Sequence, residues 1–112
     1  MLSNATYNAY DADNAAGWSG AIVNALLRTQ LGFDGVTITD SLDGTAHARG
    51  VATASLALLA IRAGTDLILL TGSEAASSVV FAKLYDAALA GSPPRASLRT
   101  SYDRIQQLKV GL

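Results

Sequence analysis

The chain has 112 residues, of which half are apolar and 15% are charged, with a formal net charge of −1. This balance suits a packed globular core and excludes an intrinsically disordered chain. Nine acids offset eight lysines and arginines, which excludes a basic nucleic-acid-binding surface, and the absence of cysteine excludes disulfides and thiol catalysis. No targeting segment and no apolar stretch of roughly 20 residues is found, so we expect a soluble protein without a membrane span, either cytoplasmic or secreted.

The first half of the chain alternates a helical pattern with a strand pattern. Residues 4–18 are polar and rich in turn formers, which predicts a loop. Apolar residues then recur at helical spacing over about 20–31. Ser19 offers an N-cap to this helix, and Gly32 is placed to end it in the left-handed conformation. The β-branched run at about 36–40 predicts a strand.

The second half is predicted to hold a helix, a strand and two more helices. These elements cover about 51–63, 66–71, 74–90 and 97–109. The polar segment 43–50 before them predicts a loop. Gly64 closes the first of these helices, and Ser73 and Ser97 offer N-caps to the last two.

The predicted order of elements, α, β, α, β, α, α, is typical of parallel β/α units. Two strands are clear, and Met1-Leu2-Ser3 offers a short third. So few parallel strands make a poor isolated sheet, because the outer ones would be unpaired apolar edges. A complete (β/α)₈ barrel needs about 250 residues. The expected fold class is therefore α/β: an incomplete (β/α)₈ (TIM) barrel segment with two to three parallel strands and four helices.

Two side chains follow the ends of the predicted strands, where parallel α/β folds gather their functional groups. They are Asp40 and Thr71. Position alone leaves two roles open for Asp40: a carboxylate that does chemistry, or a cap on the next turn or helix. No cluster of His, Cys or carboxylates and no glycine-rich phosphate loop is found, so we expect neither a metal nor a cofactor.

Four other side chains are candidates for a functional role, and for three of them the structural role is favoured. Trp18 is either a sugar platform or an aromatic staple before the first helix. Asp34 and Asp66 precede the two strands, where a carboxylate serves stability and fixes a turn. Glu74 lies in the first turn of a helix, where it favours the helix dipole.

The run from Leu31 to Leu42, Leu-Gly-Phe-Asp-Gly-Val-Thr-Ile-Thr-Asp-Ser-Leu, resembles the nucleophile segment of family 3 glycoside hydrolases. Four shorter blocks resemble the same family in the same order: Ser3-Asn4-Ala5-Thr6-Tyr7, Leu27-Arg28-Thr29-Gln30-Leu31, Ala63-Gly64-Thr65-Asp66-Leu67 and Arg104-Ile105-Gln106-Gln107-Leu108-Lys109. The resemblance spans nearly the whole chain. It implies the C-terminal part of the family's catalytic barrel domain.

By this resemblance Asp40 is the nucleophile of a retaining mechanism, which forms a covalent glycosyl-enzyme that water then hydrolyses. The residues after the nucleophile, Ser41 and Leu42, resemble the β-N-acetylhexosaminidase branch, so the implied carbohydrate substrate is a terminal β-N-acetylglucosaminide. Ser41 and Asp43 are the residues expected to contact that substrate.

The resemblance also implies a general acid/base, which that branch carries in a segment of the Lys-His-Phe-Pro-Gly-His-Gly type. The chain has no such segment, and its one histidine, His47, lies in a polar stretch typical of a solvated surface. We therefore expect the chain alone to be inactive. It is then either a non-catalytic truncated fragment or one half of a split barrel that pairs with a second chain or another copy.

A receiver-like signalling domain is the remaining alternative. Asp40 would be its phosphoacceptor and Thr71 its switch residue. Against this, no acidic pair precedes Asp40 to hold Mg²⁺, and Lys83 falls inside a predicted helix and not at a strand end.

Overall fold

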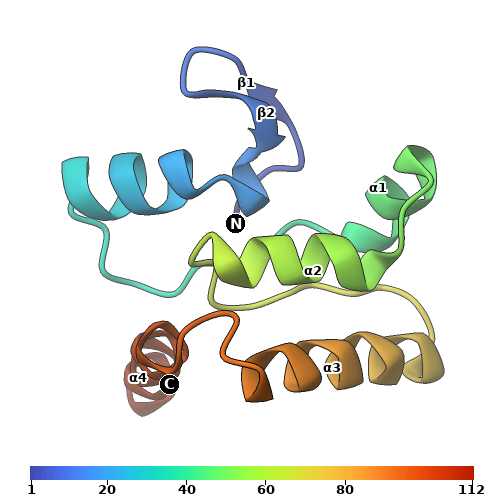
Figure 1. The fold of residues 1–112 in the computed structure, drawn as a ribbon. Coiled ribbons are helices and arrows are strands. Elements are labelled where there is room, and N and C mark those ends of the chain that lie inside the picture. The colour runs from blue at the N-terminus through green and yellow to red at the C-terminus, as the bar shows by residue number, and fades with distance from the viewer.

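The structure, a computed structural model that describes residues 1–112, has a mixed α/β fold (Figure 1). Its elements are β1 (Thr6–Tyr7), β2 (Asp11–Ala15), η1 (Ala16–Trp18), η2 (Ala21–Gln30), α1 (Leu42–Arg49), α2 (Thr53–Arg62), α3 (Glu74–Leu89) and α4 (Arg95–Val110). Figure 1 shows α2 across the middle, with the hairpin and η2 on one side and α3 on the other. No helix is both long enough and apolar enough to cross a membrane.

The four helical stretches expected from periodicity are found as η2, α2, α3 and α4. Ser19 Oγ accepts a hydrogen bond from Ile22 N at 3.1 Å, and Ser73 Oγ accepts one from Ala76 N at 3.2 Å, so both serines cap helices. Gly32 follows η2 with a φ of +66°, the left-handed value that favours glycine. Ser97 is not a cap: α4 begins two residues earlier, directly after Pro94.

The helix η2 is a π-helix, which the sequence did not predict. At its end, Leu31 N donates to Leu26 O at 2.9 Å, a hydrogen bond across five residues. The hydroxyl of Thr29 donates to Asn24 O at 3.0 Å, also five residues back. Apolar residues three and four apart occur on π- and α-helices alike, so spacing does not separate them.

The segment 43–50 was expected as a loop, and this prediction is wrong because α1 forms there. Leu42 and Ala46 lie four residues apart on one face of α1 and are both buried, so tertiary packing stabilises this short helix. Gly50 ends α1 with a φ of +66°. Two buried apolar positions among mostly polar residues make a pattern too weak to predict a helix.

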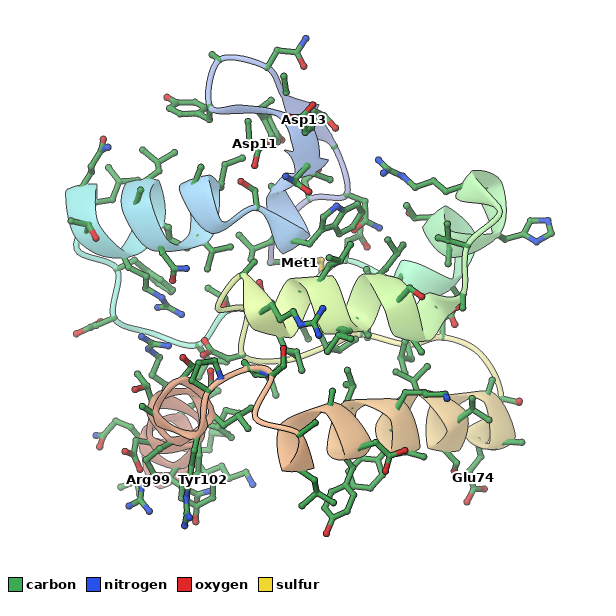
Figure 2. The ribbon with its side chains drawn as sticks, viewed as in Figure 1. Met1, Asp11, Asp13, Glu74, Arg99 and Tyr102 are labelled. Atoms are coloured by element: carbon green, nitrogen blue, oxygen red, sulfur yellow. The ribbon has the colours of Figure 1, made fainter.

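The segment 4–18 was also expected as a loop, but it contains the hairpin of β1 and β2. Asp11, labelled in Figure 2, organises the second strand: its carboxylate accepts hydrogen bonds from Ser19 Oγ at 2.6 Å and from the Asp13 and Asn14 amides at 3.0 Å. The Ser19 hydrogen bond, helped by those two amides, outweighs partial burial and holds the pKa of Asp11 below its ordinary value of 3.8.

The parallel strands expected at 36–40 and 66–71 are not regular strands, which corrects the expected architecture. Two isolated parallel bridges remain, one between Leu2 and Thr39 and one between Ile38 and Leu67. The three stretches therefore run side by side in the same direction, although β1 and β2 make the only sheet and it is antiparallel.

Side chains take hydrogen bonds that a regular parallel ladder would give to backbone carbonyls. Thr37 N donates to Asp66 Oδ2 at 2.8 Å, and Leu69 N donates to Thr39 Oγ1 at 3.0 Å. Threonine and aspartate side chains compete with the backbone in this way. This competition interrupts the ladder at both ends of the Ile38–Leu67 bridge.

The hydrophobic core is small: 18 of the 112 residues are buried, and none of them lies in α4. One cluster of eight gathers around α2, comprising Ala15, Trp18, Leu42, Ala46, Leu56, Ala57, Ala60 and Val80. This cluster joins the residues that flank Asp40 to the centre of the molecule through Leu42.

Candidate active site

Asp40 lies directly after the parallel bridge at Thr39, and its carboxylate is exposed. Its backbone N donates to Leu2 O at 2.9 Å, which ties it to the first stretch of the chain. Its Oδ1 accepts only from Ser41 N, at 2.8 Å, so Asp40 does not cap α1. The other oxygen, Oδ2, makes no hydrogen bond within the chain and is free to meet a ligand.

Ser41 and Asp43, the other predicted site residues, meet the end of the 66–71 stretch. The Ser41 and Thr71 hydroxyls are hydrogen-bonded at 2.8 Å. Asp43 Oδ2 accepts from Thr71 N at 2.6 Å and from Thr71 Oγ1 at 3.3 Å. The structure therefore gathers Asp40, Ser41, Asp43 and Thr71 at one end of the parallel stretches. Of the two carboxylates there, that of Asp43 already accepts hydrogen bonds from Thr71.

Asn4 belongs to the same end of the molecule, and the sequence interpretation did not single it out. Its Nδ2 donates to Ser41 O at 2.7 Å and to Thr45 Oγ1 at 2.9 Å. The available signal was its place directly after the Met1-Leu2-Ser3 stretch. Polar residues that follow parallel strands meet at one edge, so Asn4 belonged beside Asp40 and Thr71.

The other candidates lie apart from this cluster. The His47 side chain is exposed on α1. Trp18 is only 4% exposed and belongs to the core cluster, with the Arg49 guanidinium 5.1 Å from its ring centre, so it packs and is not available as a sugar platform. Figure 2 shows Glu74 at the start of α3 pointing away from the rest of the chain, a position that favours the helix dipole.

Asp66 lies at the opposite end of the parallel stretches, where its side chain is fully buried. Arg28 Nη2 donates to its Oδ2 at 2.8 Å, and Arg104 Nη1 donates to its Oδ1 at 3.0 Å. Ser101 Oγ, Thr37 N and Thr37 Oγ1 also donate to the carboxylate, which therefore accepts five hydrogen bonds in all. Burial opposes its ionisation, but the hydrogen bonds from Thr37, Ser101 and Arg104 prevail and hold the pKa of Asp66 below 3.8.

A cavity of about 200 Å³ opens beside Asp66, lined by polar side chains of η2, α2 and α4. Because both carboxylate oxygens are already bound by donors of the chain, Asp66 has no free lone pair directed at a ligand. Its role is to join η2, the 36–40 stretch and α4 at the end away from Asp40.

The features of the receiver-like alternative do not converge. The Thr71 hydroxyl contacts Ser41 and Asp43, and Lys83 lies exposed in the middle of α3. Asp40 therefore has neither the threonine nor the lysine as a hydrogen-bond partner.

Comparison with known proteins bears on the family of the chain. The family model described as the N-terminal domain of glycosyl hydrolase family 3 matches residues 1–108. An uncharacterized secreted glycosyl hydrolase of Arthroderma benhamiae is 34% identical over 120 residues, which cover 100% of this chain and 32% of that protein.

Solved structures extend the likeness to three dimensions. A fungal multi-domain β-N-acetylglucosaminidase of family 3 is 32% identical with a TM-score of 0.89, over 97% of this chain and 13% of that one. A β-N-acetylhexosaminidase from Beutenbergia cavernae is 36% identical with a TM-score of 0.84, over 98% of this chain and 32% of that one. The chain thus spans about a third or less of these relatives, and it belongs to glycosyl hydrolase family 3.

Proposed function

We propose that this chain is the C-terminal portion of the family's N-terminal catalytic domain, and that Asp40 is the nucleophile of a retaining glycosidase. The carboxylate would attack the anomeric carbon as the bond to the leaving oxygen breaks, and water would then hydrolyse the glycosyl-enzyme ester. The proposed substrates are terminal β-N-acetylglucosaminides.

The observation that carries the proposal is the exposed Asp40 carboxylate at the end of the Gly-Phe-Asp-Gly-Val-Thr-Ile-Thr segment. One of its oxygens is held by Ser41 N and the other is unbound, which suits attack on a carbon that approaches from solvent. The choice of sugar is supported by the two solved relatives, which are named for N-acetylglucosaminide and N-acetylhexosaminide hydrolysis.

The 112 residues alone are expected to do only half of this chemistry. Protonation of a poor leaving group needs a positioned general acid. His47 is exposed on α1, and Asp43 already accepts two hydrogen bonds from Thr71. We therefore expect nucleophilic attack on a substrate whose leaving group needs no proton, and no turnover of one that does.

The test uses these two kinds of substrate on the purified chain. A 2-fluoro-glycoside with a dinitrophenolate leaving group should give a covalent adduct that mass spectrometry maps to Asp40. An alkyl N-acetylglucosaminide, with its poor leaving group, should be hydrolysed no faster than the buffer background.

Two variants control this experiment. Asp40→Ala should abolish the adduct, and Asp34→Ala should leave it unchanged, because Asp34 is exposed at the other end of the same segment. A chain that is folded by circular dichroism but gives no adduct, or an adduct on another carboxylate, would contradict the assignment of Asp40.

We also propose that the chain is an incomplete (β/α)₈ unit whose open edge pairs with a further parallel strand. The backbone N–H and C=O groups of Ile68 and Leu70 make no hydrogen bond, while those of the alternate residues Leu67 and Leu69 are bonded to the 37–42 segment. An edge of unpaired backbone groups beside apolar side chains is a template for strand addition. Another copy of the chain or a second chain would supply that strand.

Self-association at this edge has a direct test. Sedimentation velocity at increasing concentration should show a growing oligomer fraction, and Leu70→Lys should shift the association to higher concentration. Leu59→Lys, an equal charge change at an exposed leucine on α2, is the control. A monomer at every concentration would exclude a second copy as the partner.

A further inference from the structure

Asn4 joins the first stretch of the chain to the turn that carries Asp40. Both hydrogens of its amide are used, one on Ser41 O at 2.7 Å and one on Thr45 Oγ1 at 2.9 Å. Asp40 N binds Leu2 O two residues earlier in the same stretch. The Asp40 turn is therefore held to this stretch at two points, one through backbone and one through the Asn4 side chain.

The amide oxygen of Asn4 is buried and has no hydrogen-bond partner. It faces Gly17, where an added Cβ would lie 3.8 Å from it. The Gly17 N–H cannot satisfy it, because that N–H donates to Ser3 O at 3.0 Å. A buried acceptor without a donor is unfavourable, and a native structure keeps few of them.

The orientation of this amide is set by its two acceptors. A half-turn about the last side-chain bond would place Oδ1 against Ser41 O, where two oxygens would repel. The unsatisfied oxygen is thus the cost of directing Nδ2 at Ser41 and Thr45. A residue chosen only for packing at this position would carry no buried amide.

We propose that Asn4 is a positioning residue for the Asp40 carboxylate. Asn4 restrains the carbonyl of Ser41, and the N–H of the same residue binds Asp40 Oδ1 at 2.8 Å. The restraint keeps one carboxylate oxygen bound and directs the other, Oδ2, to solvent. Since both Asn4 amide hydrogens are used within the chain, Asn4 acts through Ser41 and not on substrate. The inference rests on the proposed role of Asp40 as the nucleophile.

The test is Asn4→Asp, which keeps the side-chain shape and removes both donors at neutral pH. The variant loses the hydrogen bond from Asn4 to the Ser41 carbonyl, which restrains the turn. Amide hydrogen exchange followed by NMR should therefore show the Ser41 N–H exchanging about tenfold faster, the factor that corresponds to one hydrogen bond. The amides of α2 and α3 should keep their protection. Asn8→Asp, the same change at an exposed asparagine, should leave Ser41 as in the unmodified chain.

A second readout follows the labelling of Asp40 by the activated 2-fluoro-glycoside. Asn4→Asp should lower the saturating labelling rate about tenfold and leave the half-saturating concentration unchanged, because positioning acts on attack and not on binding. Lowering the pH should recover part of the rate relative to the unmodified chain, since a protonated Asp at position 4 regains one donor.

The outcomes separate this inference from the proposed function. If the unmodified chain gives no adduct on Asp40, the proposed function fails, and the Ser41 exchange rate still decides whether Asn4 holds the turn. Unchanged exchange and labelling in Asn4→Asp would overturn the inference, as would an equal loss of protection across α2 and α3. If Asn4→Asp does not fold, Thr45→Val is the alternative variant, because it removes only the hydrogen bond from the Asn4 side-chain amide to Thr45 in α1. In this variant the Ser41 N–H must exchange about threefold faster.

Discussion

Replacing Asp66 by asparagine is expected to lower the free energy of unfolding by roughly 3–5 kcal/mol, the range for breaking a buried ion pair. The side chain of Asp66 is fully buried between Arg28 and Arg104, whose charges would then face each other without a carboxylate. A whole domain is stabilised by only about 5–15 kcal/mol. Urea unfolding followed by circular dichroism should therefore show a large shift of the midpoint.

The matched control is Asp103→Asn. Asp103 also pairs with an arginine, Arg99, but both side chains are more than half exposed, and Figure 2 shows Arg99 on the outer side of α4. An exposed pair of this kind contributes about 0.5 kcal/mol or less. Equal losses in the two variants would contradict the structural role of Asp66.

The pH dependence of the free energy of unfolding is a second test of the role of Asp66. The native pKa of Asp66 lies below the 3.8 of the unfolded chain, so its stabilisation is fully present above that value. As the pH falls from about 5 through 3.8 to the native pKa, the unfolded chain takes up a proton first and this stabilisation is lost. The difference in stability between the unmodified chain and Asp66→Asn should hold at neutral pH and shrink below pH 4, while Asp11 affects both proteins equally.

Replacing Trp18 by alanine is expected to cost about 3–5 kcal/mol, as for other buried aromatic side chains. Its ring is 4% exposed and packs in the cluster around α2, so its removal leaves a cavity at the centre of a small core. Thermal unfolding and urea unfolding, both followed by far-ultraviolet circular dichroism, measure this loss without a tryptophan signal.

Tyr10→Ala is the control for Trp18, because the Tyr10 side chain is 59% exposed in the hairpin. Its expected effect is within about 0.5 kcal/mol. A Trp18→Ala chain that unfolds like the Tyr10 variant would place the indole outside the core. The sugar-platform interpretation would then return.

Local signals in the sequence were sufficient where a helix has an apolar stripe and a polar or glycine boundary. The caps at Ser19 and Ser73 and the left-handed glycine after η2 depend on residues within a few positions of one another. These interactions need no distant partner. α1 shows the limit, since its buried Leu42 and Ala46 gain their stability from packing against the cluster around α2.

The strands show the same limit more strongly. The β-branched run at 36–40 has the propensity of a strand, but its pairing is reduced to single bridges because Asp66 and Thr39 side chains take the N–H groups. Which groups compete for a backbone donor depends on what lies beside it in space. Propensity measured along the chain does not contain that information.

The sequence by itself determined the family, the helical stretches other than α1 and the place of Asp40 after a parallel stretch, since each depends on neighbouring residues or on a motif. Only the tertiary structure decided the rest. It brought Asn4 to Ser41, tied Asp43 to Thr71 and enclosed Asp66 between Arg28 and Arg104. These contacts join positions about 30 or more residues apart, and their energies depend on burial and on the direction of each donor, which exist only once the chain has folded.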